Sequence, residues 1–103
     1  MNVVDVDVEA VKEGLADGSM LVVDVREPHE YAAGHIPTAV NHPLSTFDPG
    51  ALPLDAGKRI VFACNSGART LKALEATQNA GIDLREHYRG SFKEWSALGL
   101  PVE

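Results

Sequence analysis

The single cysteine of the chain, Cys64, stands in a sequence context typical of a reactive thiol. Residues 60–63 before it form a short apolar run typical of a buried strand, and the residues from Ala68 onward favour a helix. Backbone N–H groups of the loop between them, together with the positive end of the helix, would point at the sulfur. Both effects stabilise a thiolate and lower the pKa of the thiol. The alternative, a small buried core cysteine, would not require Gly67 and Arg69 after it.

A second polar cluster follows another apolar run. Residues 20–25 favour a buried strand, which carries Asp24 near its end and is followed by Arg26. In a parallel sheet the carboxyl ends of the strands share one edge, where ligands bind, so this cluster and Cys64 are expected to meet. Asp24 and Arg26 could act as acid–base partners, but the pattern favours ion pairs with neighbouring residues that hold the rim of the loop.

Helical segments alternate with the strands. Asp7 predicts the N-cap of a helix that ends at Gly18, and Pro28 predicts the first turn of a short helix stopped by Gly34. A last helix is expected over residues 91–98. Its apolar face consists of three residues at three-residue steps, Phe92, Trp95 and Leu98.

The remaining segments complete an α/β pattern. A short edge strand is expected to begin at Val3 or Val4, and further short strands are expected at residues 39–41 and 84–88. Residues 43–57 favour a long, turn-rich connection with a single helical turn. Strands that alternate with helices indicate a parallel sheet covered by helices on both faces. The 103 residues, 1–103, suffice for a single domain with its own core.

Composition and charge exclude several classes of function. Lys and Arg number 9 against 15 Asp and Glu, so the net charge of -6 argues against nucleic-acid and anionic-membrane partners. No apolar run is long enough to span a membrane, and the first residues lack the pattern of a secretory signal. A single cysteine cannot form an internal disulfide, which is typical of a reducing, cytoplasmic compartment.

The histidines do not suggest a metal site, and no cofactor is expected. His29, His35, His42 and His87 lack metal-ligand spacing, and Cys64 has no partner cysteine. His35 stands in a Gly-His-Ile-Pro turn, where its imidazole is expected to bond the backbone.

Three segments of the chain, in order, resemble the single-domain rhodaneses. Residues 24–28, 30–31 and 34–41, with the sequences DVREP, EY and GHIPTAVN, are similar to the first signature of that family. Residues 64–70, CNSGART, look like its active-site loop. Four residues near the end of the chain are similar to the closing segment of that family: Gly90, Trp95, Gly99 and Pro101.

Three positions depart from the family pattern. Ser91 follows Gly90 where rhodaneses usually carry a second glycine, and the usual large aliphatic residue is missing near Thr77. Asn65 follows the cysteine where members specialised for thiosulfate often carry a basic residue. The nucleophile is untouched by these departures, but Asn65 leaves the identity of the sulfur donor open.

The resemblance implies a three-layer α/β/α rhodanese-like fold around a central, mostly parallel, five-stranded sheet. It also implies a sulfurtransferase in which Cys64 takes a sulfane sulfur from a donor such as thiosulfate and forms a persulfide. The sulfur then passes to cyanide or a thiol. The residues implied to bind the substrate are Asn65, Ser66, Gly67, Ala68, Arg69 and Thr70, with Asp24 and Arg26 behind them.

Several roles within the loop stay open. Arg69 either meets an anionic donor with its guanidinium or forms a structural bond to a neighbouring carbonyl or carboxylate. Thr70 caps the loop, bonds the outer sulfur, or is an ordinary hydroxyl at the start of a helix. Gly67 is expected to let the loop amides turn inward.

Three alternative functions share parts of this sequence pattern. A phosphatase or arsenate reductase with a related cysteine loop needs five residues between cysteine and arginine, whereas four separate Cys64 from Arg69. A non-catalytic rhodanese module used for protein binding or regulation would usually lack the cysteine. Transfer of the sulfur to a thiol of a partner protein, in place of a small molecule, is a third alternative that the sequence does not separate.

Overall fold

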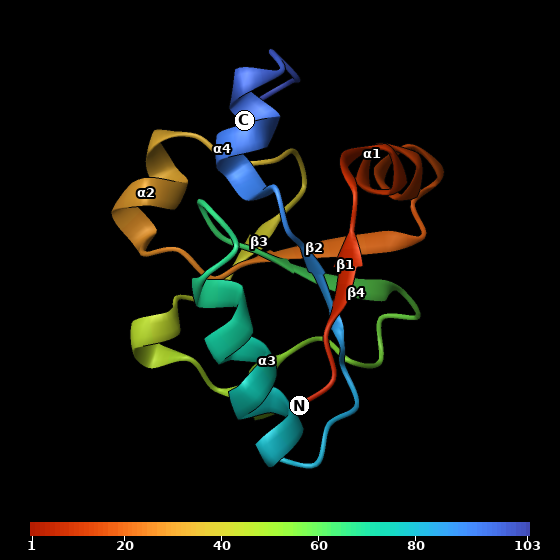
Figure 1. Ribbon diagram of the computed structural model, residues 1–103, viewed down its shortest axis with the longest axis vertical. Helices are drawn as coiled ribbons and strands as arrows, with labels where there is room; N and C mark the ends of the chain where they lie inside the picture. The colour runs from red at the N-terminus through yellow and green to blue at the C-terminus, as the bar shows by residue number, and fades with distance from the viewer.

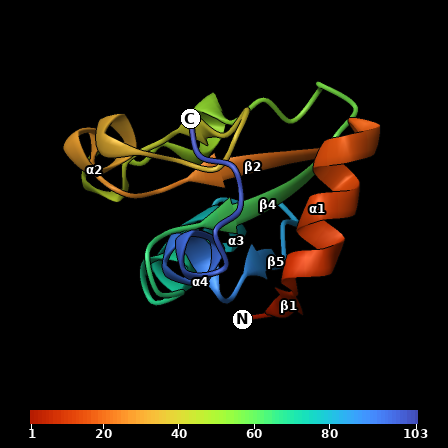
Figure 2. The ribbon, with the colours of Figure 1, turned by 90° about the horizontal axis from the view of Figure 1, so that it is seen from above.

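The computed structural model describes all 103 residues of the chain. Its centre is a sheet of five strands, β1 (Val4–Val6), β2 (Met20–Asp24), β3 (Val40–Asn41), β4 (Arg59–Ala63) and β5 (Glu86–Tyr88). The strands are ordered β1-β5-β4-β2-β3, and all four pairs of neighbours are parallel. Figure 2 shows β2, β4, β5 and β1 one after another across the sheet. The predicted α/β fold with a parallel five-stranded sheet is therefore confirmed.

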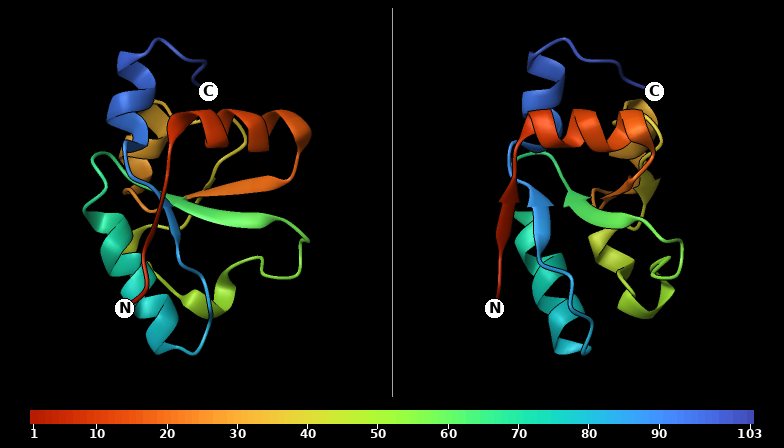
Figure 3. Two further views of the ribbon diagram at one scale, coloured as in Figure 1. Left: turned by 45° about the vertical axis from the view of Figure 1, so that its right-hand side comes forward. Right: turned by 90° about the vertical axis from the view of Figure 1, so that its right-hand side faces the viewer.

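Helices cover both faces of this sheet and complete three layers (Figures 1 and 3). On one face lie α1 (Val8–Asp17), α2 (Pro28–Ala33) and α4 (Ser91–Ala97). On the other lie α3 (Arg69–Asn79) and two 3₁₀ turns, Leu44–Thr46 and Pro49–Ala51. None of these helices is long and apolar enough to cross a membrane.

Successive side chains of β4 point to opposite faces of the sheet, so this strand contributes to the hydrophobic core on each face. Ile60 and Phe62 pack into the core beneath α3, whereas Val61 and Ala63 pack into the core beneath α1 and α4. All four side chains are at most 5% exposed, because helices cover both faces of the strand. This is why the sequence shows a continuous apolar run here and not an alternation of apolar and polar residues.

The ends of the first helix follow the sequence signals. Asp7 caps α1, since its carboxylate accepts a hydrogen bond of 2.9 Å from the backbone N–H of Ala10. Gly18 ends the helix with a φ of 75°, the left-handed conformation that glycine adopts without strain. Helix α2 likewise begins at Pro28 and ends before Gly34, as predicted.

The edge strand begins as predicted, at Val4, and β1 runs to Val6, the residue that the strand buries. Other predicted boundaries are wrong. The connection over residues 43–57 contains two helical turns. Leu98 lies beyond the end of α4 and is 57% exposed, so it does not share the buried face of Trp95. Leu100 packs against that core instead, because the chain turns after the helix ends.

The two polar strand ends predicted from the sequence do meet. β2 and β4 are neighbours in register, with Asp24 beside Ala63. The backbone N–H of Val25 still donates to the carbonyl of Ala63 at 2.8 Å, so the pairing continues to the edge of the sheet. Cys64 and Arg26 therefore emerge at one edge, at the carboxyl ends of adjacent parallel strands.

Candidate active site

Cys64 lies directly after β4 and is 1% exposed, with its sulfur enclosed by the loop that leads to α3. The backbone N–H of Gly67 donates to its Sγ at 3.0 Å. Burial raises the pKa of the Cys64 thiol, but hydrogen bonds from the amides of Thr70, Gly67, Ser66 and Arg69 outweigh burial and lower the pKa below its ordinary value. The loop thus favours a thiolate, as its sequence context predicts.

Gly67 is the residue that allows this loop to close on the sulfur. Its φ is 87°, a conformation that side chains rarely adopt. A Cβ at this position would lie 2.6 Å from the backbone oxygen of Arg89, too close for any side chain. The amide that reaches Sγ therefore depends on glycine at this point of the chain.

Thr70 is fully buried in the first turn of α3. Its Oγ1 lies 2.8 Å from the carbonyl oxygen of Gly67 and 2.7 Å from Nδ1 of His87. Its backbone amide contributes to the lowered pKa of Cys64. Of the alternatives left open for Thr70, the contacts of its hydroxyl favour a cap on the loop.

Arg69 forms a two-pronged ion pair with Glu30 of α2. Its Nη1 and Nη2 donate to the two carboxylate oxygens at 2.6 and 2.9 Å, and both side chains are about one-third exposed, at 32% and 27%. The guanidinium lowers the pKa of Glu30 to about 2. Because that pKa is lowered, the pair contributes its stability fully above the ordinary carboxyl pKa, and this stability is lost progressively as the pH falls from there through about 2.

Asp24 and Arg26 form a buried ion pair behind the loop. Arg26 donates to both carboxylate oxygens of Asp24 at 2.8–3.1 Å, and each residue is 4% exposed. Arg26 also donates to the carbonyl of Gly34 at 2.7 Å and lies 4.3 Å above the ring of Phe92. The ion pair is between the two residues themselves, and not with neighbouring residues as the sequence had suggested. Their contacts favour the structural alternative over acid–base catalysis.

Comparison with known proteins decides the family. The family model of the Rhodanese-like domain matches residues 7–98. The chain belongs to the rhodanese-like family. A rhodanese-related protein of Thermoplasma volcanium has the same fold, with a TM-score of 0.81, 27% sequence identity and 96% of each chain covered.

Relatives of this rhodanese include a named enzyme. A thiosulfate:glutathione sulfurtransferase of Saccharomyces cerevisiae is 32% identical over 99 residues, which cover 84% of this chain and 71% of the yeast protein. An uncharacterized protein of Synechocystis is 39% identical over 84 residues, or 82% of this chain. This rhodanese spans about half, 47%, of the length of the Synechocystis protein.

Ser91 explains one departure from the rhodanese pattern. Its φ is 55°, in the left-handed region that glycine adopts most easily, at the position where rhodaneses usually carry a second glycine. The serine side chain is fully buried and accepts a hydrogen bond of 3.1 Å from the backbone N–H of Cys64. Its hydroxyl donates to the carbonyl of Tyr88 at 2.7 Å. This contact with Cys64 was not predicted from the sequence.

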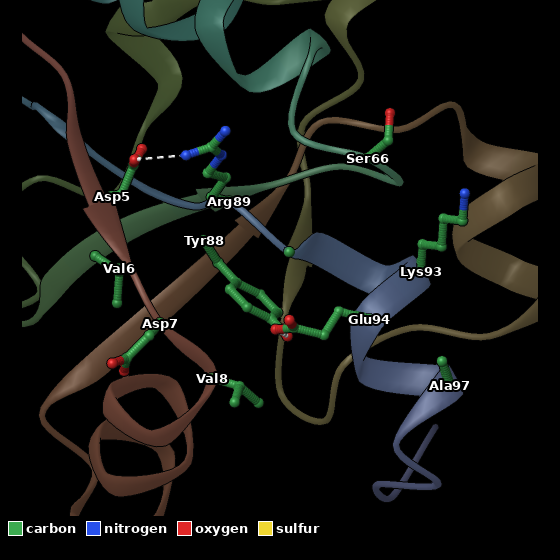
Figure 4. A pocket seen from close by; sticks show the side chains of 11 residues that line it. Asp5, Val6, Asp7, Val8, Ser66, Tyr88, Arg89, Lys93, Glu94 and Ala97 are labelled. Atoms are coloured by element: carbon green, nitrogen blue, oxygen red, sulfur yellow. Dashed lines mark hydrogen bonds and ion pairs between the residues drawn. The ribbon is translucent and has the colours of Figure 1, made fainter.

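A groove of about 770 Å³ opens beside the loop (Figure 4). Ser66 of the loop lines it, and the Tyr88 hydroxyl points across it and donates to Glu94 at 2.6 Å. Burial and the Glu94 carboxylate raise the pKa of Tyr88, so its hydroxyl stays protonated. Side chains of both charges line the groove: Asp5, Asp7, Glu94, Arg89 and Lys93.

The histidines have structural contacts. Nδ1 of His35 lies 2.9 Å from the carbonyl oxygen of Tyr31, and its ring stacks on the Tyr31 ring at 3.7 Å, so the imidazole bonds backbone as predicted. No three His, Cys, Asp or Glu side chains converge to hold a metal ion. His87 was not predicted as part of the site, because no local signal in the sequence connects it to a loop some 20 residues earlier.

The lowered pKa of Cys64 gives a direct prediction. Alkylation of the folded protein by iodoacetamide should show its pH inflection below that of a free thiol, about 8.5. The loop amides cause the shift, so the same chain unfolded in urea should show the ordinary inflection. An inflection of the folded protein at or above the free-thiol value would contradict the electrostatic role of the loop.

Proposed function

We propose that this rhodanese is a sulfurtransferase that moves a sulfane sulfur from a donor such as thiosulfate to a thiophilic acceptor through a persulfide on Cys64. The observation that carries the proposal is the convergence of loop amides on the Cys64 sulfur, with the N–H of Gly67 at 3.0 Å. Amides that stabilise a thiolate also stabilise the negative charge of a persulfide, which is more acidic than a thiol. The sulfurtransferase relatives support the same class of reaction.

The reaction divides into two balanced steps. The Cys64 thiolate attacks the sulfane sulfur of thiosulfate, a sulfur–sulfur bond forms at the cysteine, and sulfite leaves with the electron pair of the broken bond. An acceptor then attacks the outer sulfur and the Cys64 thiolate leaves. Cyanide becomes thiocyanate, and a thiolate acceptor becomes a persulfide. This is covalent catalysis with ping-pong kinetics.

The dimensions of the loop favour one sulfur atom over a phosphoryl group. The loop from Cys64 to Arg69 has four intervening residues, one fewer than the phosphatase type requires. Its amides contact the cysteine sulfur itself, and Arg69 is held by Glu30. Retention of Cys64 in an environment that lowers its pKa also argues against a non-catalytic binding module.

Arg69 supplies positive charge to this site, but Glu30 competes for it. The hydrogen bond with Glu30 raises the pKa of Arg69 most, and the charge of Cys64 raises it as well, so the guanidinium also senses the charge at the sulfur. Both terminal nitrogens of Arg69 are already engaged by the Glu30 carboxylate. An anionic donor therefore meets a guanidinium whose charge is partly neutralised, which fits a protein that is not specialised for thiosulfate.

The groove beside the loop is the proposed binding place of the acceptor. Ser66 of the loop lines it, and exposed Lys93 stands at its rim (Figure 4). Glutathione, an acceptor of the yeast relative by its name, carries two carboxylates, an ammonium and the thiol. Lys93 could pair with a carboxylate of such an acceptor and Asp7 with its ammonium. A thiol of a partner protein is the alternative acceptor.

The persulfide itself is the first test. Incubation with thiosulfate should add the mass of one sulfur atom to the intact chain, because the loop stabilises the persulfide as a resting intermediate. Cyanide should remove that mass and release thiocyanate, whereas the Cys64→Ser variant should show neither step. Aryl-phosphate hydrolysis should be undetectable. Cysteine-dependent phosphatase activity without a persulfide would show the loop-length argument to be wrong, and absence of both activities would favour the binding module.

Arg69 and Glu30 should act in opposite directions on thiosulfate. Arg69→Ala should raise the KM for thiosulfate about fivefold, the equivalent of roughly 1 kcal/mol for a partly exposed ion pair. Glu30→Gln should lower that KM, because it frees the guanidinium while keeping an acceptor oxygen for the cap of α2. Steady-state kinetics with thiosulfate and with a neutral persulfide donor would measure both effects. Equal losses in both variants with both donors would assign Arg69 a purely structural role.

Lys93 tests the acceptor groove. Lys93→Ala should raise the KM for glutathione about two- to fivefold, as expected for roughly 0.5–1 kcal/mol from an exposed ion pair, and leave turnover with cyanide unchanged. Lys58→Ala, an exposed lysine just before β4 and at the opposite end of that strand, is the matched control and should change neither. If glutathione turnover is unaffected by Lys93→Ala, the groove does not bind this acceptor.

A further inference from the structure

His87 is a buried titratable residue without a role in the proposed chemistry. It lies on β5 and is 3% exposed, and each of its two ring nitrogens contacts a residue of a different element. Nδ1 lies 2.7 Å from Oγ1 of Thr70, and Nε2 lies 2.7 Å from Oδ1 of Asp5 on β1. Thr70 Oγ1 is in turn 2.8 Å from the carbonyl oxygen of Gly67. A line of hydrogen bonds thus runs from Asp5 at the surface to the loop that encloses Cys64.

The number of protons in this line depends on the charge of His87. An ionised Asp5 only accepts, so Nε2 of His87 must carry a proton. In a neutral ring Nδ1 is then a bare acceptor and takes the single hydroxyl proton of Thr70, which leaves the Gly67 carbonyl without that donor. In the charged ring Nδ1 donates to Thr70, whose own proton is free for Gly67. All three short contacts are hydrogen bonds only when His87 carries both protons.

The carbonyl at the end of the line belongs to the residue that binds the sulfur. The N–H of Gly67 donates to Cys64 Sγ, and its carbonyl faces the Thr70 hydroxyl. These two bonds hold the peptide units on both sides of the Gly67 Cα. Loss of the Thr70 bond frees one of the two units and weakens the hold on the other.

The other groups around His87 do not supply a competing proton. β4 presents Phe62 in register with His87, and α3 presents Thr70. Arg89 lies 3.5 Å from the second oxygen of Asp5, and Glu86, the neighbour of His87 on β5, is paired with Arg59. Asp5 is therefore the charged group in contact with the ring, although it is itself 53% exposed.

We propose that His87 is a positioning residue that orders the sulfur-binding loop through Thr70 only while its imidazole is protonated. The proposal rests on the proposed sulfur transfer for its kinetic consequence. Ionisation of Cys64 accelerates persulfide formation, whereas loss of the His87 proton takes the donor from the Gly67 carbonyl and slows it. The pH profile of persulfide formation should therefore contain a decline caused by His87 as well as the rise caused by Cys64.

Three variants test this decline. His87→Asn places a permanent amide donor where Nδ1 stood, so the decline should disappear while the rise that belongs to Cys64 remains. Thr70→Val cuts the line, so the rate should be lower throughout and again show no decline. His29→Asn, at an exposed histidine, is the matched control and should keep the wild-type profile. A decline that persists in both His87→Asn and Thr70→Val, or that is absent from the wild type, would overturn the proposal.

Asp5→Asn gives a complementary result. An amide at this position can donate to Nε2, so the neutral ring can hold its proton on Nδ1 and still donate to Thr70. The loop should then stay ordered without charge on His87, and the decline caused by His87 should be lost. A decline at unchanged strength in Asp5→Asn would contradict the proton count.

Nuclear magnetic resonance separates this proposal from the proposed function, because it requires no turnover. In the wild type both ring nitrogens of His87 should be protonated at low pH, and the amides of Gly67 and Ala68 should shift with the same midpoint as the ring. In Thr70→Val the ring should still titrate and the loop amides should not follow it. If ring and loop titrate independently in the wild type, the proposal is wrong, whatever the sulfur chemistry. If they titrate together but thiosulfate forms no persulfide, the proposed function fails and the coupling stands.

Discussion

Burial of the Cys64 sulfur at the end of β4, in a loop that favours its charged form, is the constraint on which the rest of the site depends. Cys64 is 1% exposed, and the charged form of a buried group is destabilised unless donors surround it. The donors here are backbone amides, which converge on one point only if the chain turns sharply between strand and helix. Gly67 makes that turn at a φ of 87°, where a side chain would strike the backbone of Arg89.

Side chains from distant elements hold this turn in place. They come from α2, from the start of α4 and from β5, and no buried side-chain polar atom lacks a hydrogen-bond partner. The contacts are those of Glu30 with Arg69, Ser91 with Cys64, and His87 with Thr70. Fully satisfied networks of this kind rigidify a site in a medium of low dielectric. The buried Asp24–Arg26 pair holds the end of the neighbouring strand, β2, in place. Because desolvation of two charges is costly, the pair contributes to the position of this strand end more than to the stability of the fold.

The sequence determined the elements and the centre of the site, because both depend on local signals. Apolar runs predict the buried strands, and caps such as Asp7 and Gly18 set the ends of α1. The segment from β4 through Cys64 to α3 is contiguous, so its residues necessarily share one loop. The parallel order of β2 and β4 then brings Asp24 close to that loop. Leu98 was misassigned because the helical periodicity continues in the sequence beyond the point where α4 ends.

Only the tertiary structure decided which side chains meet the loop. Glu30 precedes Arg69 by 39 residues and Asp5 precedes His87 by 82, and no periodicity or spacing connects such positions. The sequence left Arg69 open between a substrate anion and a structural carboxylate, and the fold brings Glu30 of α2 to Arg69 at the start of α3. In the sequence, Ser91 only replaces a glycine that is usual in the family. The structure gives it a left-handed backbone and a buried hydroxyl that accepts a hydrogen bond from Cys64. Local propensities determine the helices and strands. The partners of polar side chains depend on how elements distant in the sequence pack together, and no local sequence pattern records that packing.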